Sequence, residues 1–149
     1  MAARATDAQP HRHVIPGVDS SLSGLALKLV LAFVLALPEA FAQDRRSRSA
    51  GLRTYPLMAV GACGMVLLGQ RAIDDVRDQA DIMYGLLNSI GFIGSGALLK
   101  NPDEPSGMAA AVSLWLTAAM GAAVGYGLPV VALALSVTSA ATFFLRKRS

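Results

Sequence analysis

Long apolar runs separated by short polar segments begin at Gly24 and continue almost to the end of the chain. A transmembrane helix needs about 20 mostly apolar residues to cross a hydrocarbon core of about 30 Å. Five runs are candidates for such helices: residues 24–42, 55–70, 82–99, 107–127 and 128–145. The runs 55–70 and 82–99 are short for a full crossing, so a re-entrant or buried segment is the alternative for each.

Helices rather than strands are expected in these runs. The runs show no alternation of apolar and polar residues, and they are rich in Ala, Leu, Gly and Met. The last two are separated only by Tyr126-Gly127-Leu128-Pro129, a turn sequence ending in a proline of the kind that begins helices. The sequence therefore predicts an all-α integral membrane protein with about five transmembrane helices, the last two forming a tight hairpin.

The same pattern divides the chain into three segments. Residues 1–23 predict a flexible polar tail, residues 24–145 a transmembrane domain, and residues 146–149 a basic cytoplasmic C-terminus. Composition agrees, because apolar residues make up 54% of the 149 residues and charged residues only 15%, whereas a soluble domain has about 25% charged residues. We therefore expect a multi-pass protein of the bacterial inner membrane, with the lipid bilayer as its first partner.

The basic residues predict an orientation. With five crossings, the arginines of residues 45–53, Lys100 and the basic C-terminus share one side, which carries eight of the 13 lysines and arginines. Because cytoplasmic loops are richer in Lys and Arg, the N-terminus is expected outside and the C-terminus in the cytoplasm. The alternative is a signal peptide cleaved after Ala42, which would leave four crossings and reverse this bias. We favour a retained first helix.

Few residues offer catalytic or metal-binding chemistry. Cys63 is the single cysteine, and His11 and His13 both lie in the polar tail. No phosphate-binding loop of the G-x-x-x-x-G-K-[ST] type is present. We therefore expect no enzymatic activity, no cofactor and no nucleic-acid partner. Metal binding stays open, because the polar segment 70–81 contains four aspartates that could bind Mg²⁺ weakly through water or be merely solvated: Asp74, Asp75, Asp78 and Asp81.

Three motifs in the same order resemble the membrane domain of the MgtC/SapB family. They are RRSRSAGLRT at residues 45–54, SIGFIGSGALLK at 89–100 and AAAVSLWLTAAMGAAVGYG at 109–127. The resemblance covers about residues 25–145. It implies a non-enzymatic inner-membrane protein that serves survival in low magnesium or, in pathogens, inside host cells. Some members are reported to restrain the F-type ATP synthase, so that complex is an expected partner, and a homo-oligomer is another.

The resemblance also marks departures from the family pattern. Ala42 stands where the family has an acidic residue, and the nearest acids are Glu39 and Asp44. Ala109 and Ala110 replace paired threonines, and Ser106 stands where an arginine is common. Many members also carry a soluble domain after the last helix, which this chain is expected to lack as a short member.

The expected function is therefore a regulatory or stress-adaptation role that acts through membrane partners. The alternative to this role is an ion or small-solute transporter or channel subunit.

Three polar residues within or beside the apolar runs are candidate functional groups: Glu39, Asn88 and Arg53. Glu39 is expected either to form an interfacial ion pair with Arg45, Arg46 or Arg53, or to replace the missing family carboxylate. Asn88 lies inside the third run, where an amide without a partner is costly. We expect its amide to hydrogen-bond another helix or, alternatively, to contact a ligand or ion.

Small residues predict where helices pack. In lipid, close backbone approach is a main source of attraction between helices, so small residues mark their interfaces. The fourth run has such residues at four-residue spacing: Ser113, Thr117, Gly121 and Gly125. In the third run, Gly91 and Gly94 are the corresponding candidates. The alternative is a permeation path lined by glycines.

Overall fold

The computed structural model describes residues 22–44, 51–99 and 106–146. Within these ranges the chain forms five α-helices and no strand, as the pattern of apolar runs predicted. The helices are α1 (Leu22–Asp44), α2 (Gly51–Ala72), α3 (Val76–Leu99), α4 (Ser106–Gly125) and α5 (Pro129–Arg146). The expected tail lies outside the described residues except at Leu22 and Ser23, which begin α1.

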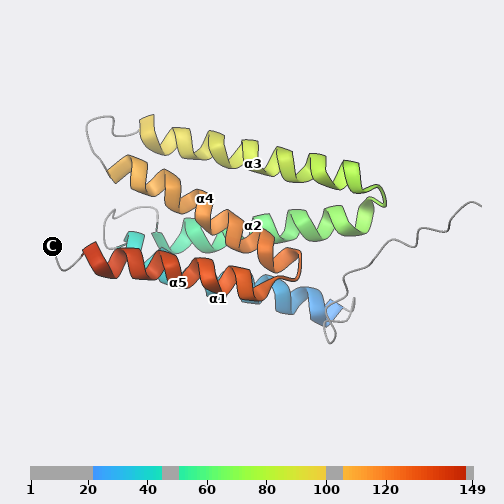
Figure 1. The fold of residues 1–149 in the computed structure, drawn as a ribbon, viewed down its shortest axis with the longest axis horizontal. Coiled ribbons are helices and arrows are strands. Elements are labelled where there is room, and N and C mark those ends of the chain that lie inside the picture. The colour runs from blue at the N-terminus through green and yellow to red at the C-terminus, as the bar shows by residue number, and fades with distance from the viewer. Residues whose placement is uncertain (1–21, 45–50, 100–105, 147–149) are drawn as a thin grey trace, which may run out of the picture.

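The helices run alternately in opposite directions along one bundle (Figure 1). One end carries the start of α1, the α2–α3 connection and the α4–α5 turn, and we call it the Lys28 end. The other carries the end of α1 and the start of α2, and we call it the Glu39 end. This alternation is the arrangement that five successive crossings would produce.

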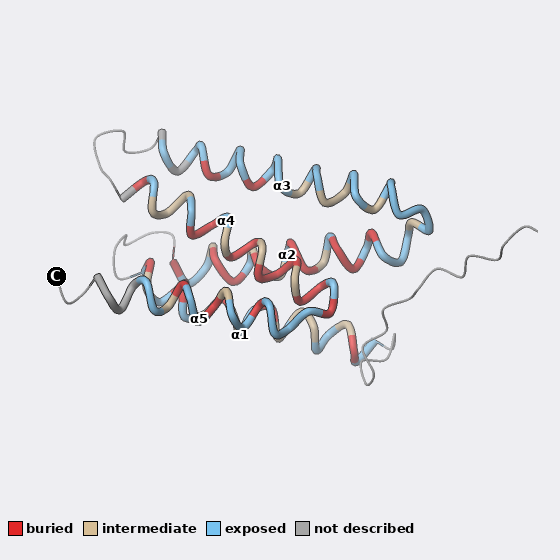
Figure 2. Tube along the Cα trace, in the orientation of Figure 1, coloured by how far each residue is buried: buried red, intermediate tan, exposed pale blue. Residues whose placement is uncertain are grey.

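Helix α4 lies at the centre and contacts each of the other four helices. Its sequence explains this position, because it is almost entirely apolar on all sides and consists largely of Ala, Gly, Ser and Thr. Such small side chains allow neighbouring backbones to approach from several directions. Helix α3, by contrast, contacts only α4 and α2 among the described residues, and most of its length is exposed (Figure 2).

Helix α1 packs through an alanine stripe. Ala32, Ala36 and Ala40 recur at four-residue spacing and are completely buried. The first two belong to a core cluster with Ala59 and Cys63 of α2. Pro38 lies within α1, where it cannot donate a backbone hydrogen bond. Nearby, the hydroxyl of Ser136 in α5 donates to the Leu35 carbonyl across 2.9 Å, so α5 is tied to the same part of α1.

The turn between α4 and α5 lies where the sequence predicted it. Gly127 has a φ of 77°, a left-handed conformation in which glycine is favoured. The Gly127 N–H donates to the Val124 carbonyl, and the Leu128 N–H donates to the Ala123 carbonyl, which is the Schellman end of a helix. The Lys28 ammonium of α1 donates to the Gly125 carbonyl across 3.2 Å, where a cation also complements the helix dipole.

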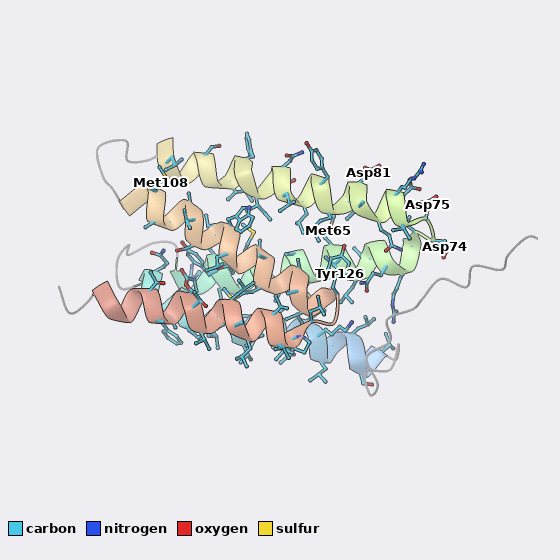
Figure 3. The ribbon with its side chains drawn as sticks, viewed as in Figure 1. Met65, Asp74, Asp75, Asp81, Met108 and Tyr126 are labelled. Carbon is cyan, nitrogen blue, oxygen red and sulfur yellow. The ribbon has the colours of Figure 1, made fainter. Side chains whose placement is uncertain are left out.

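The second polar segment is shorter than expected. Only residues 73–75 separate α2 from α3, and the remainder of the predicted segment 70–81 is helical. The reason is a helix cap, because the Asp75 carboxylate accepts a hydrogen bond of 2.7 Å from the Arg77 N–H. Asp78 then lies in the first turn of α3, where a negative charge is favourable. The acidic residues therefore gather at the start of α3 (Figure 3).

Three helices are long and apolar enough to cross a membrane: Leu22–Asp44, Gly51–Ala72 and Gly107–Gly125. Pro129–Thr142 of α5 is apolar but shorter. Helix α2 extends beyond the expected run 55–70 at both ends, so its length suits a full crossing. Within the described residues, α3 and α5 do not meet the same criterion, and their crossing stays a prediction.

Candidate functional site

Buried polar side chains gather toward the Glu39 end, between α1, α2 and α4. Glu39 is 1% exposed, and it shares this region with four other residues whose exposure is below one tenth: Gln43, Tyr55, Ser113 and Thr117. We call these five residues the buried polar cluster. Four-residue spacing positions four of them, because Glu39 and Gln43 lie on one face of α1, and Ser113 and Thr117 lie on one face of α4.

Hydrogen bonds link the cluster across the helices. The Gln43 amide Nε2 of α1 donates to the Ser113 hydroxyl of α4 across 2.8 Å. The Tyr55 hydroxyl of α2 donates to the Ala110 carbonyl of α4 across 3.4 Å. Within α4, the Thr117 hydroxyl donates to the Ser113 carbonyl across 2.8 Å. Tyr55 also belongs to one core cluster with Ala40, the neighbour of Glu39 in α1, and with Leu114 of α4. The cluster therefore connects α4 with both α1 and α2.

This arrangement suits polar contact and charge within the bilayer better than bond-making chemistry. It brings together one carboxylate, one amide, one phenol and two hydroxyl groups, and the described part of the chain contains no histidine to act with them. No group of three His, Cys, Asp or Glu side chains that could hold a metal ion occurs within residues 22–44, 51–99 and 106–146. The aspartates at the start of α3 are not part of any such group within these residues.

The other two candidate polar residues lie apart from the cluster. Arg53 is exposed near the start of α2, and no ion pair joins it to Glu39; Arg45 and Arg46 lie outside the described residues. Asn88 is also exposed. The expected hydrogen bond from Asn88 to another helix is absent among the described residues, because α3 turns Ile90 toward its neighbours and Asn88 away from them.

The small residues of α4 lie at helix contacts. Ser113, Thr117, Gly121 and Gly125 are all buried. A Cβ atom added to Gly121 would overlap the Ala59 carbonyl of α2, coming within 2.7 Å of its carbon. A Cβ atom added to Gly125 would lie 2.8 Å from the Val66 Cβ and 3.0 Å from the Cys63 carbonyl oxygen. Glycine is required at both positions because the α2 surface occupies the space of a side chain.

The two glycines of α3 differ. Gly94 is buried, and a Cβ added there would lie 3.6 Å from the Ala111 Cβ of α4, which is an ordinary contact. Gly91 is exposed, and an added Cβ would meet nothing within 4 Å. Gly91 therefore does not pack within this bundle, contrary to expectation, because it lies on the outer side of α3.

Sequence reasoning missed two members of the buried polar cluster, Gln43 and Tyr55. A signal for Gln43 was present, since it follows Glu39 by one helical turn and therefore shares its face. Tyr55 gave a weaker signal, because a tyrosine at the start of an apolar run is also typical of the membrane–water interface. Its buried position follows only from how α2 packs on α4.

The Gln43–Ser113 hydrogen bond provides a test of the cluster's geometry. We expect Gln43→Leu and Ser113→Ala to destabilise the folded bundle each by about 0.5–1.5 kcal/mol, and the double variant to cost less than the sum of both. Reversible unfolding in mixed micelles measures this coupling energy. The same cycle with Gln70→Leu, an exposed residue of α2, serves as the control. Additive costs for Gln43 and Ser113 would contradict the hydrogen bond.

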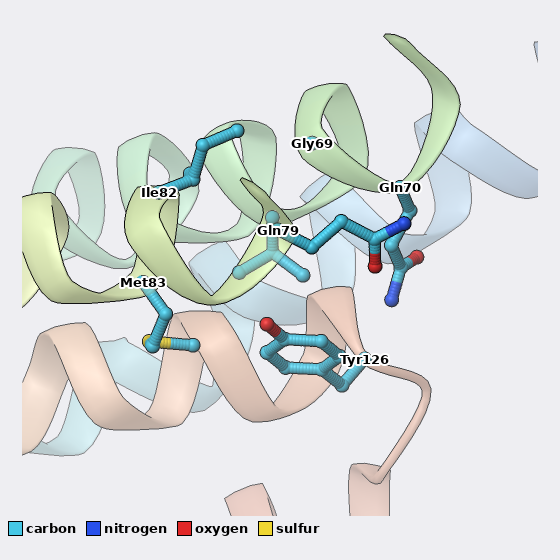
Figure 4. A pocket seen from close by; sticks show the side chains of 7 residues that line it. Gly69, Gln70, Gln79, Ile82, Met83 and Tyr126 are labelled. Carbon is cyan, nitrogen blue, oxygen red and sulfur yellow. The ribbon is translucent and has the colours of Figure 1, made fainter. Parts of the chain in front are cut away.

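A second, smaller feature is a shallow hollow at the Lys28 end. It lies between α2, α3 and the residue that follows α4, and Gln70, Gln79 and Tyr126 bring polar side chains to it (Figure 4). The Gln79 amide donates to the Ile73 carbonyl across 2.7 Å, so this side chain already closes the α2–α3 turn. The position of Gln79 at the hollow is therefore explained by its hydrogen bond across the α2–α3 turn.

Comparison with known proteins places the chain among membrane proteins. It is 33% identical to the protein MgtC of Brucella abortus (strain 2308), over 83% of this chain and 49% of the relative. It is 31% identical to the protein SrpB of Synechococcus elongatus, over 70% of this chain and 65% of the relative. It is 28% identical to YhiD of Escherichia coli (strain K12), over 68% of this chain and 51% of the relative, and the name of that protein proposes a magnesium transporter.

The chain spans about half to two thirds of the length of these relatives. No solved structure matches it. The sequence profile of the MgtC family matches residues 29–149, which includes all of α2, α3, α4 and α5 and most of α1. The match thus covers the whole buried polar cluster and the contacts of Gly121 and Gly125. The chain belongs to the MgtC family of membrane proteins.

Proposed function

We propose that this chain is a non-enzymatic regulatory or stress-adaptation protein of the bacterial inner membrane, acting through contacts between its helices and another membrane complex. The resemblance to the MgtC/SapB family supplies the setting, which is adaptation to low magnesium or to a host. It also supplies a candidate partner, the F-type ATP synthase. Membership of the MgtC family supports the statement that this chain is a membrane protein. The regulatory role is our inference.

The observation that carries this proposal is the closed centre of the bundle. Gly121 and Gly125 bring the α4 backbone directly against α2. Thr117, Met120 and Val124 lie in the same part of α4 and are at most 2% exposed. Such close contact leaves little room for water between α2 and α4 at these residues. The surfaces of the bundle that remain available are the outward faces of the helices, which favours action on a neighbouring protein over conduction through this chain.

The proposed orientation puts the Glu39 end in the cytoplasm and the Lys28 end outside, with five crossings. The positive-inside rule supports this orientation, because the arginines of residues 45–53 and the basic C-terminus adjoin the Glu39 end. The buried polar cluster then lies in the cytoplasmic half of the bilayer. A regulator of a cytoplasmic activity of a membrane complex would place its polar groups on this side.

The second candidate function is transport of an ion or small solute. A buried carboxylate inside a membrane domain favours it, because such groups are costly in lipid and often mark ion or proton pathways. The name of the relative YhiD points to the same alternative. Ion flux into liposomes that contain the purified protein would support transport if Glu39→Gln or Asn88→Leu abolished it.

The regulatory proposal is tested by recovery of partners from native membranes. A C-terminally tagged protein is extracted in mild detergent, and the accompanying chains and its own N-terminus are identified by mass spectrometry. We expect stoichiometric recovery of the ATP synthase or another membrane complex, together with an N-terminus that precedes α1. Recovery of this chain alone, combined with ion flux in liposomes, would overturn the regulatory proposal. An N-terminus at Gln43 would overturn the five crossings.

A further inference from the structure

Helix α3 is held by the bundle along one side only. Its inner side carries Ile90, which is 4% exposed and packs with Ala62 and Ala118 of α2 and α4. Its opposite side carries Tyr84 and Phe92, which are 69% and 81% exposed. Gly85, Asn88 and Ser95 lie on this side as well by helical spacing, and all are exposed. We call this side the outer face of α3.

Asn88 is a residue of this face whose polar side chain lipid cannot satisfy. It lies near the middle of α3, and its amide offers two donors and one acceptor. The serines beside it are satisfied within their own helix: Ser89 donates to the Gly85 carbonyl across 2.8 Å, and Ser95 donates to the Phe92 carbonyl across 2.7 Å. No such bond is present for the Asn88 side chain within the described part of the chain. Hydrocarbon offers it no partner.

We propose that the outer face of α3 binds the same face of a second copy of this chain. This inference rests on α3 lying in the bilayer, as proposed above. Copies inserted in the same direction can pair about a twofold axis along the membrane normal, so that Asn88 of one copy lies at the same depth as Asn88 of the other. An amide is both donor and acceptor, and Asn88 of one copy therefore satisfies Asn88 of the other.

The rest of the face is compatible with this pairing. Arg77 and Asp81 lie one helical turn apart and are both exposed. Because the arginine side chain is long, Arg77 of one copy can reach Asp81 of the other near the Lys28 end. A Cβ added at Gly85 would meet nothing within 4 Å, so a second helix can approach there closely. The face thus combines a self-complementary amide with complementary charges, and a copy of the chain matches both.

Crosslinking in native membranes tests which face pairs. Single cysteines are introduced as Phe92→Cys and Ser95→Cys in a Cys63→Ala background, and the membranes are oxidised. The control is Val137→Cys on α5, which is 59% exposed. We expect disulfide-linked dimers for the two α3 positions and none for Val137→Cys. Should Cys63→Ala fold poorly, the same comparison is made with the buried Cys63 retained. Equal yields at all three positions, or none on α3, would overturn the proposal.

A second measurement tests the amide itself. We expect Asn88→Leu to weaken association about 3- to 30-fold, the range found for polar contacts between helices in membranes, and Asn88→Gln to retain it. Energy transfer between labelled copies at increasing lipid dilution measures this change. Unchanged association of Asn88→Leu would overturn the proposal. Absence of association in the protein that retains Asn88, with continued recovery of a partner complex, would overturn this inference alone and leave the regulatory function standing.

Discussion

Gly121→Leu is expected to stop α4 from closing on α2 while leaving insertion into the membrane intact. The Ala59 carbonyl of α2 occupies the space of a Gly121 side chain, and even a methyl group would overlap it. Adding atoms to a packed protein interior typically lowers the free energy of unfolding by about 1–3 kcal/mol, and by more where the neighbouring group cannot move. A backbone carbonyl within a helix cannot move freely, so we expect the free energy of unfolding to fall by more than about 3 kcal/mol.

Thermal unfolding in detergent, followed by the fluorescence of Trp115, measures this loss. The matched control is Gly61→Leu, because Gly61 also lies within a helix and an added Cβ there meets nothing within 4 Å. We expect Gly61→Leu to unfold near the wild-type temperature. Carbonate extraction shows whether both variants enter the membrane. A Gly121→Leu protein as stable as Gly61→Leu would refute the close approach of α4 and α2.

Glu39→Gln is expected to remove function with little effect on the fold. The substitution keeps the size and shape of the side chain but replaces the carboxyl group with a neutral amide, and Glu39 is 1% exposed among polar groups of three helices. Ionisable side chains inside membrane domains are rare and usually serve function. We therefore expect recovery of the partner complex to fall about tenfold, which corresponds to about 1.4 kcal/mol, and growth of the host strain at low magnesium to slow.

Asp44→Asn provides the control for this experiment. Asp44 is an exposed carboxylate at the end of the same helix, so its charge is already solvated. We expect Asp44→Asn to behave as wild type in partner recovery, in growth and in thermal stability. Equal loss of function in both variants would mean that function depends on the acidic groups of the Glu39 end in general and not on the buried position of Glu39. Full activity of Glu39→Gln would exclude a role for the buried charge.

Most of the architecture could be predicted because its determinants are local. The lengths of the apolar runs predicted five helices, and the sequence from Tyr126 to Pro129 predicted the turn that the structure contains. Small residues at four-residue spacing predicted one contact face of α4, and Gly121 and Gly125 lie there against α2. These features depend only on spacing along one helix and on the conformational freedom of glycine.

The rotation of α3 about its axis could not be predicted in the same way. Small or polar residues occur on both sides of this helix: Gly94 faces α4, whereas Gly91 and Asn88 face outward. In water, the apolar side of a helix identifies the buried side, but in lipid that signal is lost because the surroundings are also apolar. Likewise, the burial of Tyr55 depends on contacts between α2 and α4 that are distant in sequence.

The bonds from α1 to the last hairpin constrain the order in which the protein can be assembled. Lys28 reaches the Gly125 carbonyl, and Ser136 reaches the Leu35 carbonyl, so the first helix is joined to segments made about 100 residues later. Contacts of such long sequence separation form slowly. During synthesis, α1 therefore remains in the bilayer with part of its alanine stripe uncovered until α4 and α5 have been made. The final hairpin closes the bundle, and a chain interrupted before Pro129 lacks the hydrogen bond from Ser136 to the Leu35 carbonyl.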